Sequence, residues 1–188
     1  MKIRFASLKD VPAIMALGQA MMAESRFNHY NFNADKTRDL IKHMLTRQPA
    51  TDCILLAENN QGELAGMLAG YMVDFFFCDG NVVQDRVYYV LPEHRGSSAA
   101  FKLILAFRRW AESKQASELS INMSVAIDMP RFNKLMNHLG FNCCGSNFAM
   151  TLKYVNNVKE SDANQQTNTQ ENNATSSNAI NSTFETIQ

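Results

Sequence analysis

The sequence is poor in the residues that build metal sites and disulfide frameworks. Only four of its 188 residues are cysteines, and no two of them form a Cys-x-x-Cys pair. Because structural zinc sites and disulfide scaffolds need cysteines in closely spaced groups, we expect neither of them here. The cysteines are then expected to be reduced thiols, as is usual in the cytoplasm.

Long apolar runs and a strong charge imbalance are also missing. No stretch is long enough to span a bilayer, and the first residues lack the apolar core of a signal peptide. The chain is neutral overall, but four acidic residues and no basic ones follow Lys159, which leaves the preceding part with a charge of about +4. That surplus suits an anionic ligand but is too small for the basic stripe of a nucleic-acid-binding protein. We therefore expect a cytoplasmic protein that binds neither membranes nor nucleic acid.

The common glycine-rich nucleotide loops are absent as well, because nothing reads G-x-x-x-x-G-K-S/T and no G-x-G-x-x-G follows a strand. Residues 87–110 instead combine a β-rich run closed by Pro92, a cluster of small residues and an apolar helical pattern. A tight turn into a helix leaves N–H groups unpaired at the positive end of the helix dipole. Arg95 adds a guanidinium suited to phosphate oxygens, and residues 96–100 carry little side chain. This segment is predicted to be an anion-binding loop.

The same residues resemble the signature of the GCN5-related N-acetyltransferases, which reads Arg/Gln-x-x-Gly-x-Gly/Ala between a strand and a helix. One position departs from this pattern, because Ser98 stands where the family has its central glycine. A small hydroxyl residue is compatible with a bound diphosphate provided that its φ need not be positive. The alternative is an ordinary strand–turn–helix capped by Ser97 or Ser98. The matching residues are Arg95, Gly96, Ser97, Ser98, Ala99 and Ala100, preceded by Val90-Leu91-Pro92.

The order of the predicted elements resembles the same family. It reads β-α-α-β-β-β-α-β-α-β-β, which implies an α+β, three-layer fold with a mixed, mostly antiparallel central sheet and helices on both faces. We expect one domain over residues 1–158 and a disordered tail over 159–188, which is rich in Asn, Gln, Ser and Thr. The expected strands are 2–6, 53–58, 64–77, 82–90, 118–125, 141–144 and 148–154, and the expected helices run to about 24 and over 34–47, 99–113 and 130–138.

The resemblance implies transfer of an acetyl group from acetyl-CoA to a primary amine of a small molecule or protein, by direct attack in a ternary complex. The diphosphate would bind the N–H groups of the loop, and the strand before it would pair its main chain with the pantetheine arm. No metal is implied. The cofactor-binding residues expected on this basis are Tyr89, Val90, Leu91, Arg95, Gly96, Ser97, Ser98, Ala99, Ala100 and Asn133.

An ammonium must lose its proton before it attacks, so a carboxylate near the acceptor is required. Asp74 is one candidate, but Glu24 and Asp85 are preferred because the family places acceptor-site groups on their elements. The family often has a tyrosine general acid on its fourth helix, and Met136 stands at that position here. Either Tyr88 or Tyr89 substitutes for it, with Tyr89 taken as the catalytic candidate, or solvent protonates the thiolate, or turnover is poor.

A second interpretation stays open. The departures at Ser98 and Met136 are compatible with a catalytically lapsed acyl-CoA-binding or protein-interaction module of the same fold. The acceptor and the oligomeric state are not given by the sequence, although dimers are common in the family and a homodimer is one option.

Overall fold

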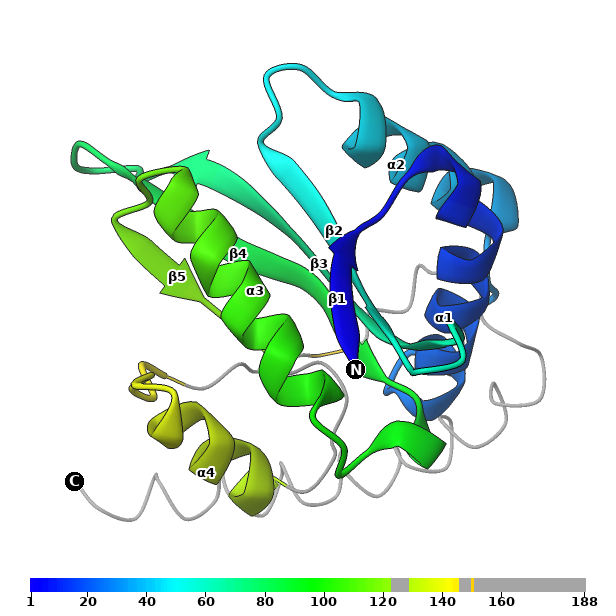
Figure 1. The fold of residues 1–188 in the computed structure, drawn as a ribbon. Helices are drawn as coiled ribbons and strands as arrows, with labels where there is room; N and C mark the ends of the chain where they lie inside the picture. The colour runs from blue at the N-terminus through cyan, green and yellow to red at the C-terminus, as the bar shows by residue number, and fades with distance from the viewer. Residues whose placement is uncertain (123–128, 146–149, 151–188) are drawn as a thin grey trace, which may run out of the picture. The chain divides into compact units, whose positions relative to one another are not determined.

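The computed structural model describes residues 1–122, 129–145 and 150, and the chain divides into two units. The first comprises Met1–Phe27 and Phe32–Gly145, and the second comprises Asn28–Asn31 and Ser146–Gln188. All the helices and strands described below belong to the first unit (Figure 1). The tail predicted at 159–188 lies outside the described residues.

The first unit is built on one five-stranded sheet. Its order is β1-β2-β3-β4-β5, with antiparallel pairs from β1 to β4 and a parallel pair between β4 and β5. The mixed, mostly antiparallel sheet of an α+β fold is thereby confirmed. The strands are β1 (Lys2–Phe5), β2 (Asp52–Glu58), β3 (Leu64–Asp74), β4 (Asn81–Val90) and β5 (Glu118–Ser120).

Helices cover both faces of this sheet, as expected. Helix α3 lies across one face, whereas α1 and α2 pack on the other face against β2 and β3 (Figure 1). The helix α3 presents a buried stripe at helical spacing, which explains its amphipathic sequence. The helices are α1 (Val11–Glu24), α2 (Ala34–Thr46), α3 (Ala99–Ser113) and α4 (Met129–His138), with 3-10 turns η1 (Leu8–Asp10) and η2 (Pro92–His94).

Alternation along the central strands serves both layers. Leu55 packs in the apolar cluster under α3, and its neighbour Leu56 packs in the cluster under α1 and α2. Successive side chains of a strand point to opposite faces, so a strand buried on both sides reads as a continuous apolar run. This is why β2, predicted only as an apolar strand, lies inside the sheet.

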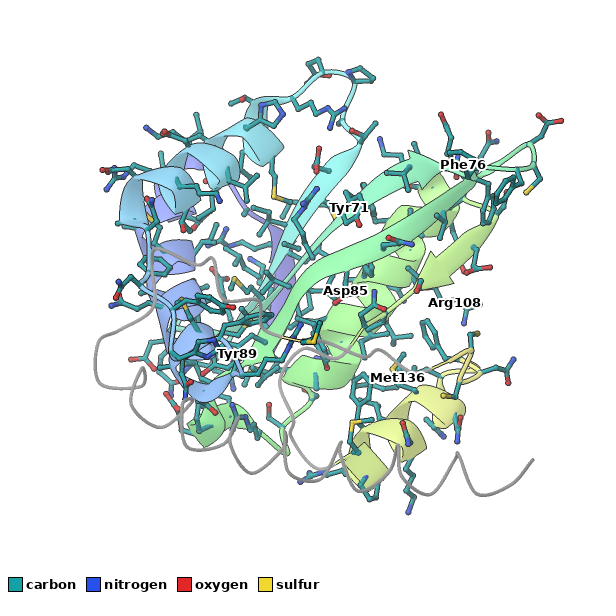
Figure 2. All side chains as sticks on the ribbon, turned by 180° about the vertical axis from the view of Figure 1, so that it is seen from behind. Tyr71, Phe76, Asp85, Tyr89, Arg108 and Met136 are labelled. Carbon is teal, nitrogen blue, oxygen red and sulfur yellow. The ribbon has the colours of Figure 1, made fainter. Side chains whose placement is uncertain are left out.

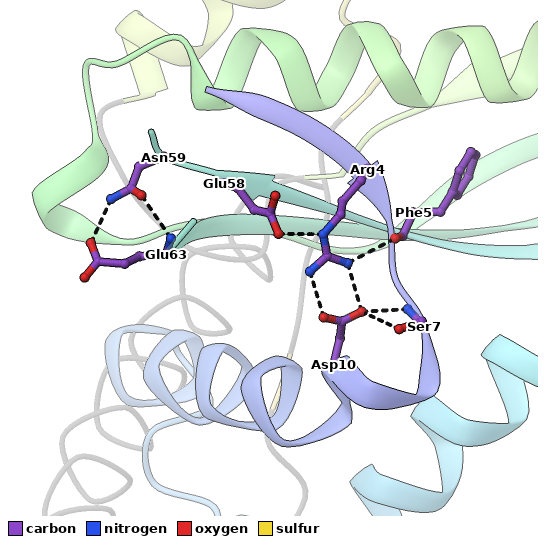
Figure 3. A network of polar contacts seen from close by, with 7 residues as sticks. All are labelled: Arg4, Phe5, Ser7, Asp10, Glu58, Asn59 and Glu63. Carbon is purple, nitrogen blue, oxygen red and sulfur yellow. Dashed lines mark hydrogen bonds and ion pairs between the residues drawn. The ribbon is translucent and has the colours of Figure 1, made fainter. Parts of the chain in front are cut away.

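The edge strand β1 is fastened by one arginine. Arg4 donates from Nε to Glu58 Oε1 at 2.5 Å and from both terminal nitrogens to the Asp10 carboxylate at 2.7 and 2.9 Å (Figure 3). Asp10 also accepts from the Ser7 N–H at 2.7 Å. These hydrogen bonds hold the pKa of Asp10 well below its ordinary value. The network ties β1 to β2 and to the turn that starts α1.

The structure departs from the predicted strands in three places. Strand β3 ends at Asp74 rather than at residue 77, because residues 75–80 form the connection to β4 and Gly80 takes a φ of +108° there. Strand β5 has only three residues, and part of its predicted length lies in 123–128, outside the described residues. Residues 141–145 have no regular secondary structure, so the strand expected at 141–144 is not formed, and its expected partner at 148–154 lies outside the described residues except for Met150.

Helix α4 carries the methionine that replaces the tyrosine usual in the resembled family. Met136 is 9% exposed and packs in the apolar cluster with α3. It is therefore a core residue. No helix among the described residues combines the length and apolar character needed to cross a bilayer.

Candidate active site

The segment between β4 and α3 has the turn geometry that the sequence predicted. Gly96 adopts a φ of +94°, which only glycine takes without strain, and Ser98 adopts a φ of −76° just before the helix starts. The serine at the family's glycine position is therefore in a backbone conformation that any residue accepts. The requirement that the φ of Ser98 need not be positive for a bound diphosphate is therefore met.

Half of the loop amides are available to a ligand. The N–H of Arg95 donates to Pro92 O at 3.1 Å, that of Ser97 to His94 O at 3.2 Å, and that of Ala99 to Ser97 Oγ at 3.2 Å. Within the described residues, the N–H groups of Gly96, Ser98 and Ala100 have no hydrogen-bond partner. Ser98 and Ala100 stand at the start of α3 and Gly96 lies just before it, where the helix dipole favours an anion. Of the six amides expected to bind an anion, three therefore have partners within the protein and three have none among the described residues.

The ladder between strands β4 and β5 is short among the described residues. They pair only over three positions, Val82–Gln84 with Glu118–Ser120. Beyond them Asp85 accepts hydrogen bonds from the N–H of Asn122 at 2.6 Å and from its Nδ2 at 3.2 Å. The Asp85 side chain thus bonds to the chain after β5 directly beyond the last backbone pair of the ladder. Among the described residues, no ladder pair joins β5 to β4 from Asp85 to Val90.

Part of this stretch of β4 is already used by the protein itself. Arg95 Nε donates to Val90 O at 3.1 Å, whereas the Leu91 N–H donates to Ala65 O of the neighbouring strand β3 at 3.0 Å, on the opposite edge of β4. A pantetheine arm that pairs with Val90 O has to displace Arg95 from it.

Helix α1 ends so that its last residue faces β4. Ser25 caps the helix by donating from N to Met22 O at 3.2 Å and from Oγ to the same oxygen at 3.0 Å. It is only 3% exposed, so the end of the helix is fixed in the core. Glu24, immediately before it, reaches the Tyr89 hydroxyl and the Arg95 guanidinium.

These three residues, predicted separately from the sequence, form one cluster. The Tyr89 hydroxyl donates to Glu24 Oε1, and Arg95 Nη2 donates to Glu24 Oε2 at 2.7 Å. The Arg95 guanidinium carbon lies 5.7 Å from the centre of the Tyr89 ring. The cluster joins α1, β4 and the loop before α3 at a single carboxylate.

The cluster determines the charge state of its members. Burial alone would raise the pKa of Glu24, but the hydrogen bonds from Tyr89 and Arg95 outweigh it, and the pKa is lowered. Burial and the bond to Glu24 raise the pKa of Tyr89 to about 12. At neutral pH Glu24 is therefore a carboxylate and Tyr89 keeps its proton. As long as Arg95 is in place, Glu24 is a weak base.

The other predicted residues lie apart from this cluster. Asp85 is 8% exposed with its carboxylate held by Asn122, and burial raises its pKa. Asn133 is exposed on α4, and its side chain makes no hydrogen bond within the described residues. Asp74 is exposed at the end of β3. Tyr88 lies apart from Tyr89, because its ring packs beside Phe132 of α4, with 6.3 Å between the ring centres. Burial raises the pKa of Tyr88.

Sequence reasoning missed Arg131. Its Nη2 lies 3.4 Å from the position that a Cβ on Gly96 would take, so α4 brings a second guanidinium to the loop. The sequence offered no signal for it, because the proximity depends on how α4 packs.

Two surface grooves lie away from the cluster. One of about 670 Å³ runs between β1 and α3 and includes Ile3 and Trp110, and one of about 410 Å³ lies between α3, β5 and the residues after α4. Neither includes the loop or Glu24. No group of three side chains able to hold a metal ion occurs in the described part of the chain.

Solved structures similar to this fold include acetyltransferases at low sequence identity. A probable acetyltransferase is 19% identical with a TM-score of 0.65 and covers 81% of this chain and 99% of its own. The ribosomal-protein-alanine N-acetyltransferase from Brucella melitensis biovar Abortus 2308 is 22% identical with a TM-score of 0.59, covering 81% and 100%. The aminoglycoside antibiotic 6'-N-acetyltransferase AAC(6')-IG from Acinetobacter haemolyticus is 20% identical with a TM-score of 0.61, covering 82% and 100%. At these identities the likeness establishes the fold alone.

Comparison with curated protein sequences found no match. The family model described as the acetyltransferase (GNAT) family matches residues 18–141, which include the second half of α1, the strands β2 to β5, the loop and α4. Because this match spans more than half of the sequence and agrees with the loop and the fold, the chain belongs to the acetyltransferase (GNAT) family.

Proposed function

We propose that the protein is an N-acetyltransferase that transfers the acetyl group of acetyl-CoA to a primary amine by direct attack in a ternary complex. The observation that carries the proposal is the loop at the start of α3 with its N–H groups that have no partner among the described residues, placed directly after β4, whose described ladder with β5 is short. A diphosphate fits three unpartnered N–H groups at a helix N-terminus.

The residues present fit acetyl-CoA, which supplies the acetyl group as a thioester. Gly96, Ser98 and Ala100 would hold the diphosphate through their N–H groups, together with the Arg95 guanidinium. The main chain of Tyr89 and Val90 would bind the pantetheine arm along β4. Positioning of this kind supplies much of the rate of an acyl transfer.

Glu24 is the proposed general base. It takes the proton of the acceptor ammonium, directly or through one water, so that the free amine can attack the acetyl carbon. The carbon–sulfur bond then breaks, and the nitrogen loses its second proton to solvent. Tyr89 holds the carboxylate in position through its hydroxyl. A tyrosine whose pKa is raised to about 12 is a weak acid, so solvent is the proposed source of the proton for the thiolate.

Binding of acetyl-CoA is tested by thermal denaturation. We expect millimolar acetyl-CoA to raise the Tm, because a ligand at 100 times its Kd stabilises the folded state by about 2.7 kcal/mol. Arg95→Ala should reduce the shift, whereas Arg109→Ala, a substitution on α3 away from the loop, should leave it unchanged. No shift for the wild-type protein would refute the proposal.

Transfer is tested by release of free CoA thiol with a panel of amines, amino acids, aminoglycosides and peptides. The second candidate, a lapsed acyl-CoA-binding module, is favoured by the burial of Met136 at the position of the family's tyrosine. It predicts a Tm shift with no release of CoA that depends on an acceptor.

A further inference from the structure

Strand β4 carries a further arginine, Arg86, next to the proposed site. This arginine has no role in the proposed acetyl transfer. Between β3 and β4, Ala69 pairs with Val87 and Gly70 pairs with Asp85, so that Arg86 has no partner across the ladder. This is a β-bulge, a device that redirects a side chain and is frequent beside active sites. Arg86 is exposed.

The guanidinium of Arg86 is held over an aromatic ring. Its central carbon lies 4.2 Å from the centre of the Tyr71 ring. Tyr71 is itself fixed, since its hydroxyl donates to Gln84 Oε1 at 2.9 Å. A guanidinium placed over a ring keeps the N–H donors at its edge directed outward, which prepares it for two parallel hydrogen bonds to an oxyanion.

No carboxylate of the described residues neutralises Arg86 within 4.0 Å. The carboxylate next to it in sequence, Asp85, is committed to Asn122. The carboxylate of the proposed site, Glu24, is committed to Arg95 and Tyr89. The guanidinium of Arg86 is therefore ordered by its neighbours and lacks a counter-ion from them.

This group and the proposed base share one side of the sheet. Tyr71 alternates with Met67 and Ala69, which pack in the same cluster as Tyr89 under α1 and α2. Figure 2 shows Tyr71, Asp85 and Tyr89 following one another along β3 and β4. Arg86 precedes Tyr89 by three residues, a separation of about 10 Å along a strand.

We propose that Arg86, placed over Tyr71, binds an oxyanion of the acceptor. The acceptor is then an amine that also carries a carboxylate or a phosphate, with its amine at Glu24 and its oxyanion at Arg86, rather than a polycation such as an aminoglycoside. This inference rests on the proposed acetyl transfer and names the class of its substrate.

Binding is tested without turnover by NMR of the arginine side-chain Nε–H groups. The probes are 6-aminohexanoate, which has an amine and a carboxylate, and hexylamine, which has the amine alone. A second pair, 3-aminopropylphosphonate and propylamine, separates the phosphate-type oxyanion from the carboxylate. We expect the Arg86 signal to move with the probe that carries an oxyanion and to stay in place with its partner. An Arg86 signal that responds to neither oxyanion would overturn the inference.

Turnover gives the second measurement. We expect kcat/KM for 6-aminohexanoate to exceed that for hexylamine by about tenfold or more, which is typical for a charge-assisted hydrogen bond. Arg86→Gln should remove this preference and keep the Tm shift with acetyl-CoA, whereas Arg109→Gln should keep both. A preference that survives in Arg86→Gln would refute the role of Arg86. Loss of the wild-type Tm shift with acetyl-CoA would instead refute the proposed function, and the NMR result would still decide whether Arg86 binds oxyanions.

Discussion

Replacing Glu24 with glutamine should move cofactor binding and catalysis in opposite directions. Arg95 cannot give the same donors to Glu24 and to a diphosphate, so binding of acetyl-CoA has to draw its guanidinium away from the carboxylate. Glu24→Gln removes the negative charge that competes with the diphosphate for the Arg95 guanidinium. It also removes the proposed base.

The size of each effect follows from the contacts. The side chains of Arg95 and Glu24 are 28% and 31% exposed, and ion pairs this accessible contribute up to about 1 kcal/mol. Removing the pair should therefore tighten acetyl-CoA binding by up to about fivefold, since 1.4 kcal/mol corresponds to a factor of ten. Loss of a general base should lower kcat by about 100- to 10,000-fold.

Isothermal titration with acetyl-CoA and a free-thiol assay with a saturating amine measure the two effects. The matched control is Glu112→Gln, which breaks the exposed pair between Glu112 and Arg108 on α3, 2.8 Å long. It should change neither quantity. Weaker acetyl-CoA binding in Glu24→Gln would show that the pair supports the cofactor site, and an unchanged kcat would exclude Glu24 as the base.

Three further predictions concern stability. Gly96→Ala should lower the free energy of unfolding by about 1 to 2 kcal/mol in urea titrations, because Gly96 has a φ of +94°. The control Ser98→Gly, at a φ of −76°, should change the free energy of unfolding by less than about 1 kcal/mol. Equal effects of the two substitutions would contradict the loop geometry. Gly70→Ala should lower the free energy of unfolding by about 1 to 3 kcal/mol, because its Cβ would overlap the Phe107 ring. Gly18→Ala in α1, where a Cβ meets no atom within 4 Å, should raise it by up to about 1 kcal/mol. Tm shifts of opposite sign for the two variants would confirm this pair of predictions. Asp10→Asn should lower the free energy of unfolding by about 1.5 to 3 kcal/mol at pH 7. A carboxylate with a lowered pKa stabilises the fold above its ordinary pKa near 3.8 and loses this contribution as the pH falls toward the lowered pKa, so the effect of the substitution should shrink at acidic pH. A loss independent of pH in urea titrations would contradict the role of the Arg4 network.

Much of the fold could be predicted because its signals are local. The bounds of α3 at 99–113 follow from apolar spacing and from the small residues before it, and both read directly along the chain. The loop was predicted for the same reason, since a strand, a turn and a helix are consecutive. The end of β3 was placed three residues late, because Phe75, Phe76 and Phe77 continue an apolar pattern although Phe76 and Phe77 are 90% and 93% exposed in the connection.

The sequence by itself determined the class of fold, the position of the loop and the residue types that can bind a diphosphate, because each depends on neighbours in the chain. Only the tertiary structure decided that Glu24 meets Arg95 across 71 residues and that a bulge directs Arg86 onto Tyr71. It also decided that Arg95 and Val90 O already bind each other. Contacts of this kind depend on strand register and helix packing, where a shift of one residue reverses the face of every side chain, and no local pattern encodes that choice.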